Sequence, residues 1–116
     1  MNSEFELINL FNQIGSKYYK ENGVIIPPGD DCAVFESKKK IVTSVDASVE
    51  GIHFLKNTNP QDIAYRSIAV AISDIAAMGC KPIAFSLSVT SPFQDRAWFE
   101  DFAFGTNEIA NQFKIP

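Results

Sequence analysis

The strongest constraint on the fold is a helix signal over residues 59–79. Asn59 is a favourable N-cap, Pro60 suits the first helical position, and Asp62 places a carboxylate in the first turn. The pattern stops at Met78-Gly79, since glycine readily ends a helix. The apolar positions between these signals are Ala64, Ile68, Ala71, Ile72, Ile75 and Ala76. Because several of them are alanines, we expect this helix to pack closely on a sheet.

Strand patterns lie on both sides of this helix. Residues 32–35 and 40–45 are two apolar runs joined by the turn 36–39, and residues 83–90 resemble a buried strand. A shorter apolar run, 24–26, is stopped by prolines. The alternation of helix and strand patterns, without an internal repeat, predicts an α/β chain.

Two further helices are expected near the ends of the chain. Ser3 and Glu6 form a capping box that starts a first helix over about residues 3–19. Its apolar positions are Phe5, Ile8, Phe11 and Ile14. Ser91-Pro92 opens the last helix. The apolar face of that helix consists of Trp98, Phe102, Ile109 and Phe113. An aromatic stripe at this spacing is more typical of a core or an interface than of a cofactor site.

Composition excludes several classes of protein. The 116 residues are 46% hydrophobic and 21% charged, which fits one domain with a core and excludes wholesale disorder. A net charge of −4, with Lys38–Lys40 as the basic run, disfavours nucleic-acid binding. No apolar run approaches the roughly 18 residues of a membrane span, and the acidic N-terminus lacks a signal-peptide layout. Cys32 and Cys80 are therefore expected to be reduced thiols of a cytoplasmic protein.

The informative polar residues are carboxylates at the ends of expected elements. Gly29-Asp30-Asp31 lies in a turn before a strand, and Asp46 follows the strand 40–45. Asp74 sits one turn before the end of its helix, where a negative charge opposes the helix dipole by about 0.3–1 kcal/mol. Such a placement suggests a compensating cation. A solvent-facing carboxylate, or one bonded to a neighbouring loop, is at least as good an interpretation of each residue taken alone.

Together these positions offer an oxygen-only set of ligands: Asp31, Ser44, Asp46 and Asp74. Such hard ligands suit Mg²⁺, whereas one histidine and two distant cysteines cannot build a zinc site. The glycines form neither a P-loop nor a dinucleotide-binding fingerprint, so a phosphate would be held through metal ions and backbone groups. Spacing alone therefore indicates a candidate magnesium–phosphate site and no more.

Four motifs resemble the thiamine-monophosphate kinase family in order and spacing. They are Gly29-Asp30-Asp31-Cys32-Ala33, Ser44-Val45-Asp46, Val49-Glu50-Gly51-Ile52-His53-Phe54 and Ser73-Asp74-Ile75-Ala76-Ala77-Met78-Gly79. The resemblance covers nearly the whole chain but only the N-terminal domain of that family's enzyme. Aminoimidazole ribonucleotide synthetase and selenophosphate synthetase share the fold but not this pairing of Gly-Asp-Asp with Glu-Gly-x-His-Phe.

The resemblance implies a phosphotransferase that uses ATP to convert thiamine monophosphate to thiamine diphosphate. By position, Asp31, Ser44, Asp46 and Asp74 would bind several Mg²⁺ ions, and His53 would contact the thiamine phosphate. Asp30 would act through a water or another residue. Because the acceptor is already an anionic phosphate oxygen, metal-assisted in-line transfer needs no catalytic base from the protein.

The resemblance also implies architecture. It predicts an α/β (α+β) domain with a four-stranded mixed or antiparallel sheet, helices on one face, and a second copy that completes a barrel-like homodimer. Residues 1–116 would be the N-terminal domain, the C-terminal domain would be absent from this chain, and the fragment alone would be inactive. Ile83–Val89 and the other apolar strands are consistent with a sheet buried on both faces.

Some alternatives remain open. The chain departs from the family at Val45, where a hydroxyl residue is common, so a backbone carbonyl would serve there or one metal would be held more weakly. Without its motif, His53 would be a partly buried structural residue. The chain could also belong to another ATP-dependent enzyme of the superfamily, or be a non-catalytic dimerisation module that retains the acidic residues.

Overall fold

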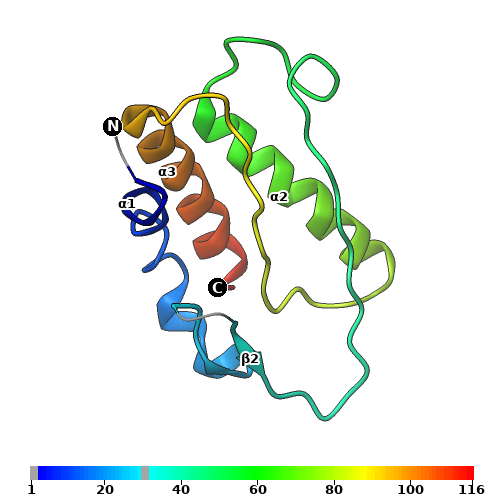
Figure 1. Ribbon diagram of the computed structural model, residues 1–116. Coiled ribbons are helices and arrows are strands. Elements are labelled where there is room, and N and C mark those ends of the chain that lie inside the picture. The colour runs from blue at the N-terminus through cyan, green and yellow to red at the C-terminus, as the bar shows by residue number, and fades with distance from the viewer. Residues whose placement is uncertain (1–2, 30–31) are drawn as a thin grey trace.

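Two long helices, α2 (Pro60–Ala77) and α3 (Arg96–Phe113), pack against each other and carry the hydrophobic core (Figure 1). The computed structural model describes residues 3–29 and 32–116. The core has two clusters of buried side chains, Ile68, Ile72, Ile109 and Ile115 in one and Ile63, Ala64 and Phe102 in the other. At the crossing, Gly105 lies so close to α2 that an added Cβ would be 2.8 Å from the Cα of Gln61.

Helix α2 forms as its local signals predict. The Asn59 side chain accepts a hydrogen bond from the Gln61 N–H at 2.9 Å, and Pro60 occupies the first helical position. The helix ends at Ala77, and Gly79 follows in the left-handed region with φ of 70°. The predicted start and end of this helix are therefore confirmed, but the expectation that it packs on a sheet is wrong, because α2 packs against α3.

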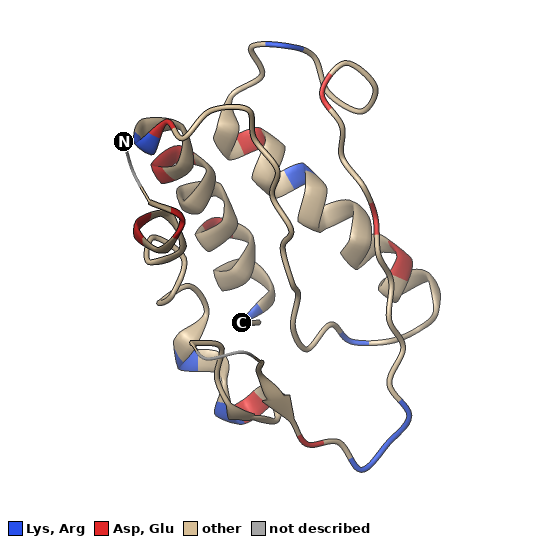
Figure 2. Ribbon diagram, viewed as in Figure 1, with Lys and Arg blue, Asp and Glu red and all other residues tan. Residues whose placement is uncertain are grey.

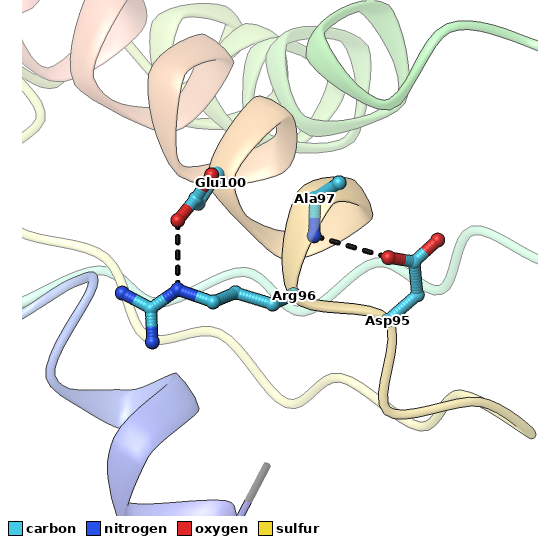
Figure 3. A network of polar contacts seen from close by, with 4 residues as sticks. All are labelled: Asp95, Arg96, Ala97 and Glu100. Atoms are coloured by element: carbon cyan, nitrogen blue, oxygen red, sulfur yellow. Dashed lines mark hydrogen bonds and ion pairs between the residues drawn. The ribbon is translucent and has the colours of Figure 1, made fainter. Parts of the chain in front are cut away.

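Helix α3 begins later than its predicted start at Ser91-Pro92. The Ser91 hydroxyl donates to the Phe93 carbonyl at 2.9 Å and accepts from the Phe93 N–H at 3.2 Å, which closes a local turn instead. Asp95 is the N-cap, because its carboxylate accepts from the Ala97 N–H at 3.0 Å (Figure 3). The ion pair between Arg96 and Glu100, at 2.8 Å, lies on the first turn.

The apolar face predicted for this last helix is present. Phe102 and Ile109 are buried, while Trp98 and Phe113 are half-buried against the core. The indole of Trp98 stacks on the ring of Phe102 at a centroid distance of 5.1 Å.

The first helix, α1 (Glu4–Ile8), is much shorter than the predicted span of residues 3–19. Its capping box between Ser3 and Glu6 is confirmed. Turns and two 3₁₀ segments, η1 (Ser16–Tyr18) and η2 (Lys20–Asn22), replace the rest of the helix.

Gly15 departs from the expected helical path at a point beyond the end of α1 at Ile8. It adopts a φ of 68°, and its Cα lies so close to the C-terminal segment that an added Cβ would be 2.5 Å from the Cα of Pro116. The left-handed backbone at Gly15 therefore leaves room for this segment to dock. Phe5, which was assigned to the apolar face of the helix, is 78% exposed, and Leu7 is buried instead.

The sheet has two antiparallel strands, β1 (Val24–Ile26) and β2 (Val34–Phe35), in which Val24 pairs with Phe35 and Ile26 with Val34. This ribbon lies at one end of the helical pair rather than beneath it (Figure 1). The chain is thus mixed α/β, but the four-stranded sheet with helices on one face is not formed within the described residues.

Residues 40–45 and 83–90 account for this difference. Both were predicted as strands, and both run as irregular segments without a ladder. A strand needs a neighbour for its backbone N–H and C=O groups, and within the described part of the chain neither segment has a strand beside it. Within 83–90, the Phe85 N–H donates to the Pro116 carbonyl at 3.2 Å, and the Phe85 ring packs on the core.

Candidate functional site

Three of the four predicted metal ligands lie together at the C-terminal end of α2. The Ser44 hydroxyl donates a hydrogen bond to Asp74 Oδ2 at 3.1 Å, although the two residues are 30 positions apart. Asp46, two residues further along the same segment, contacts the Asp74 carboxylate. The fourth ligand, Asp31, and the neighbouring Asp30 lie outside the described residues.

The proximity of the two carboxylates changes the acidity of Asp46. Hydrogen bonding to Asp74 raises the pKa of Asp46, and partial removal from water and the negative charge of Asp74 act in the same direction. His53 opposes this effect weakly. A cation bound between these two carboxylates would offset the repulsion between their negative charges.

The donor set fits Mg²⁺ chemically, since Ser44, Asp46 and Asp74 offer oxygen atoms only. Over residues 3–29 and 32–116, no group of three or more His, Cys, Asp or Glu side chains converges as a metal-binding cluster. Two carboxylates and a hydroxyl are therefore the part of the predicted set that the structure brings together. The side chain of Val45, which lies between Ser44 and Asp46, is 95% exposed and contributes no oxygen.

Charge is distributed unevenly along this part of the molecule (Figure 2). The segment that carries Ser44 and Asp46 passes the C-terminal end of α2, and acidic positions lie on both. The basic run Lys38–Lys40 belongs to the same segment but lies at its far end. The basic run therefore does not neutralise the Asp46–Asp74 pair.

His53 lies in a tight loop that connects the segment of Ser44 and Asp46 to α2. The Val49 N–H donates to the ring Nδ1 of His53 at 2.9 Å, and the His53 N–H donates to the Val49 carbonyl at 2.8 Å. Gly51, with φ of 82°, supplies the left-handed turn, and its N–H donates to the Phe54 carbonyl at 2.7 Å. His53 is exposed, so the partial burial expected for a structural histidine is not found, although its ring does bind the backbone of its own loop.

A half-open pocket of about 550 Å³ lies between this loop and the first half of α2. Its polar lining includes His53, Asp62 and Arg66, and its apolar lining includes Phe54 and Ile63. Arg66 Nη1 donates to the His53 carbonyl. Arg66 is not among the residues predicted from the sequence, because helical periodicity places it on the polar face of α2 and does not indicate which loop that face meets.

Two further features bear on the class of protein. Among the described residues, no helix combines the length and the apolar character needed to cross a membrane. Cys32 is exposed, Cys80 is half-buried, and both are free thiols, as their spacing predicted.

Comparison with known proteins agrees with the motifs. A family model described as "AIR synthase related protein, N-terminal domain" matches residues 29–116. The chain is similar to proteins named thiamine-monophosphate kinase from Buchnera aphidicola subsp. Schizaphis graminum (42% identity over 115 residues), Escherichia coli K12 (38% over 116) and Bacillus subtilis 168 (36% over 120).

Each of these alignments covers 97% of this chain but only 34–35% of the relative. The chain thus spans about a third of the length of the curated relatives that it matches. The resemblance noted from the motifs is confirmed, and the matched region includes the segment of Ser44 and Asp46, the His53 loop and both long helices. The chain therefore belongs to the AIR synthase related protein family and carries the family's N-terminal domain.

Proposed function

We propose that this chain forms the magnesium- and substrate-binding N-terminal part of a kinase that phosphorylates thiamine monophosphate with ATP, giving thiamine diphosphate. The observation that carries the proposal is the convergence of Ser44, Asp46 and Asp74 at one end of α2. The names of the relatives supply the substrate class.

In this proposal Ser44, Asp46 and Asp74, with Asp31, hold Mg²⁺. Bound Mg²⁺ would neutralise the two phosphate groups that must approach each other. Asp46 and Asp74 contribute negative charge that favours cation binding, and the Ser44 hydroxyl orients the Asp74 carboxylate through its hydrogen bond. No side chain needs to accept a proton, because the attacking oxygen belongs to a phosphate that is already ionised.

His53 is the proposed contact for the phosphate of thiamine monophosphate. Its Nδ1 is occupied by the Val49 N–H, so the ring nitrogen left for a ligand is Nε2. In the neutral ring, Nε2 then carries the hydrogen and can donate to an anionic oxygen. The pocket beside His53 offers both polar and apolar walls for the remainder of the substrate.

A second copy of the chain is the proposed partner of the unpaired strand segments, which would complete the four-stranded sheets and the barrel-like dimer. Apolar side chains are exposed along both segments: Ile41, Val42, Val45, Leu87 and Val89. Pairing would satisfy the backbone groups that lack a ladder and would bury these side chains. Sedimentation at micromolar concentration should show a dimer, and a strict monomer would contradict this part of the proposal. The proposed location of the protein is the cytoplasm.

Mg²⁺ binding tests the site directly. Calorimetric titration with Mg²⁺ in the presence of ATP should give binding that both Asp46→Asn and Asp74→Asn weaken by at least about tenfold, since each variant removes a charged ligand. Asp101→Asn is the matched control, because Asp101 is an exposed aspartate on α3, away from the site. Equal Mg²⁺ binding in all four proteins would contradict the proposed site and favour a non-catalytic module.

Turnover identifies the acceptor. The natural full-length protein should form thiamine diphosphate from thiamine monophosphate, ATP and Mg²⁺, whereas residues 1–116 alone should show little or no activity. Phosphorylation of a different acceptor would contradict the proposed substrate and favour another ATP-dependent enzyme of the superfamily.

A further inference from the structure

The loop 49–54 is held by hydrogen bonds within its own turn and by one hydrogen bond from α2 to the His53 backbone. Inside the loop, the Val49 N–H, the Val49 carbonyl and the Gly51 N–H make the three hydrogen bonds described above. Across the loop, the guanidinium of Arg66 donates to the carbonyl of His53, 13 residues earlier in the chain. The position of the His53 backbone therefore depends on α2.

The hydrogen bond from Val49 determines the protonation pattern of the neutral imidazole ring. A backbone N–H is a donor, so the Nδ1 atom that it contacts at 2.9 Å must present a lone pair. The hydrogen of the neutral ring then resides on Nε2. This tautomer persists only while the ring and the Val49 amide keep their relative position, which requires the loop to hold its shape.

Arg66 is well suited to hold that shape. It extends from the part of α2 where the neighbouring residues Ile63 and Ala64 are buried in the core, so its backbone position is fixed by packing. A guanidinium remains charged at every relevant pH, and its planar set of donors gives a directional hydrogen bond to a carbonyl.

The same helix also carries the metal-site carboxylate. Asp74 lies eight residues after Arg66 within α2, a rise of about 12 Å along the helix axis at 1.5 Å per residue. One rigid helix thus holds Asp74 directly and the His53 backbone through Arg66. The two halves of the site are linked through the structure even though their residues come from separate segments.

We propose that Arg66 is a positioning residue: by holding the His53 carbonyl against α2, it maintains the Val49–His53 hydrogen bond and keeps His53 in the tautomer with its hydrogen on Nε2, directed at an anionic oxygen of the substrate. The last step rests on the proposed function, whereas the hydrogen bonds and the tautomer do not. Arg66 touches His53 and is not required to touch the substrate.

The positioning role is tested by ¹⁵N NMR of the histidine rings in the full-length protein, with His53→Gln to assign the signal. At alkaline pH, where imidazole is neutral, the wild-type shifts should show an unprotonated Nδ1 and a protonated Nε2. Arg66→Gln should move both shifts toward a mixture of tautomers. It should also raise the hydrogen-exchange rate of the Val49 amide about fivefold, as expected for the loss of one hydrogen bond.

Two matched variants separate positioning from general effects. Arg96→Gln removes an equally charged arginine from the exposed first turn of α3 (Figure 3) and should leave the His53 signals unchanged. Arg66→Lys keeps the charge but lacks the planar donors, so it should give intermediate shifts. If Arg66→Gln does not fold, Arg66→Lys decides the question. Wild-type shifts with hydrogen on Nδ1, or Arg66 variants identical to wild type, would overturn the proposal.

Kinetics of the full-length enzyme then separate this inference from the proposed function. Arg66→Gln should raise the KM for thiamine monophosphate about fivefold and leave the KM for ATP and kcat within about twofold, because positioning of His53 affects substrate binding. An unchanged KM together with shifted His53 signals would support the positioning role and overturn the assignment of His53 to the substrate. A changed kcat with unchanged ring shifts would overturn the positioning role.

Discussion

The helical pair and the strand-like segments use similar apolar residues with opposite results. Ile109 of α3 is 0% exposed, whereas Val45 is 95% exposed. Ile68 and Ile72 of α2 are buried, whereas Ile41, Leu87 and Val89 present much of their surface to water. Both regions are rich in branched apolar side chains, so hydrophobicity alone does not explain the difference.

The difference comes from where each region finds partners for its backbone. A helix pairs its N–H and C=O groups within four residues, so α2 and α3 can form first and then bury one face against each other. A strand finds those partners only on another strand. Among the residues that the structure describes, 40–45 and 83–90 have no such neighbour, and apolar side chains such as Ile41, Leu87 and Val89 therefore remain exposed, while Phe85 packs on the core.

Hydrogen exchange should give the largest contrast between the regions. In dilute protein, amides in the middle of α2 and α3 should exchange at least about 1,000-fold more slowly than those of residues 40–45, because helix opening requires loss of the core. Mass-spectrometric exchange measures both regions in one experiment. Protection of 83–90 that increases with protein concentration would indicate pairing with a second copy, and equal protection of helices and segments at every concentration would contradict the comparison.

Truncation of a core side chain should have the next largest effect. Ile109→Ala removes a fully buried side chain from α3 and should lower the free energy of unfolding by about 3 kcal/mol in urea denaturation. Val45→Ala should change it by less than about 0.5 kcal/mol, since its side chain is already in water. If both variants lose similar stability, the strand segment is packed in solution and the contrast is wrong.

The helix crossing should respond to a single methyl group. Gly→Ala inside a helix ordinarily stabilises by up to about 1 kcal/mol, yet Gly105→Ala should destabilise by about 1–3 kcal/mol. The added Cβ would clash with the backbone of Gln61 and push α2 away from α3. Asn107→Ala, at an exposed position of the same helix, is the control and should be close to neutral. A more stable Gly105→Ala protein would show that the helices are not in close contact at this point.

Protonation of Asp46 at the candidate metal site should have the smallest effect on the stability of the folded chain. Because the pKa of Asp46 is raised in the folded chain, the folded state holds this proton more tightly than the unfolded state does. Stability from this group is therefore present at low pH and is lost as the pH rises through the raised pKa of the folded state. Asp46→Asn should remove this component from the pH dependence of Tm, and no difference from wild type would contradict the coupling to Asp74.

Mg²⁺ sharpens the same test. Cation binding favours the deprotonated carboxylate, so saturating Mg²⁺ should reverse the sign of the Asp46 contribution, and stability should then rise with pH over this range. The reversal should be absent in Asp46→Asn and retained in Asp101→Asn. A wild-type profile that Mg²⁺ leaves unchanged would argue against the metal site.

Local interactions made several features predictable. The Asn59 cap, the end of α2 near Gly79 and the Ser3–Glu6 capping box depend on contacts over two to four residues, and all three are present. The unfavourable position of Asp74 near the end of α2 suggests a compensating cation, which stays a prediction. The hydrogen bond from Ser44 agrees with the alternative of a carboxylate bonded to a neighbouring segment.

Predictions failed where a distant contact competed with a local pattern. The first helix is shorter than predicted, and at Gly15 the backbone turns left-handed where it lies against Pro116, about 100 residues away in the chain. Arg66 was missed because its hydrogen bond to His53 depends on the path of the intervening loop.

The sequence by itself determined where α2 starts and ends, where α1 starts, and which oxygen ligands the candidate site can offer, because capping and ligand chemistry reside in a few adjacent residues. The tertiary structure alone decided that Ser44 meets Asp74, that Arg66 holds His53, and that residues 40–45 and 83–90 stay unpaired. The physical reason is that these outcomes depend on which distant backbone and side-chain groups come within hydrogen-bonding distance. Local propensity does not specify that distance; packing of the whole chain does.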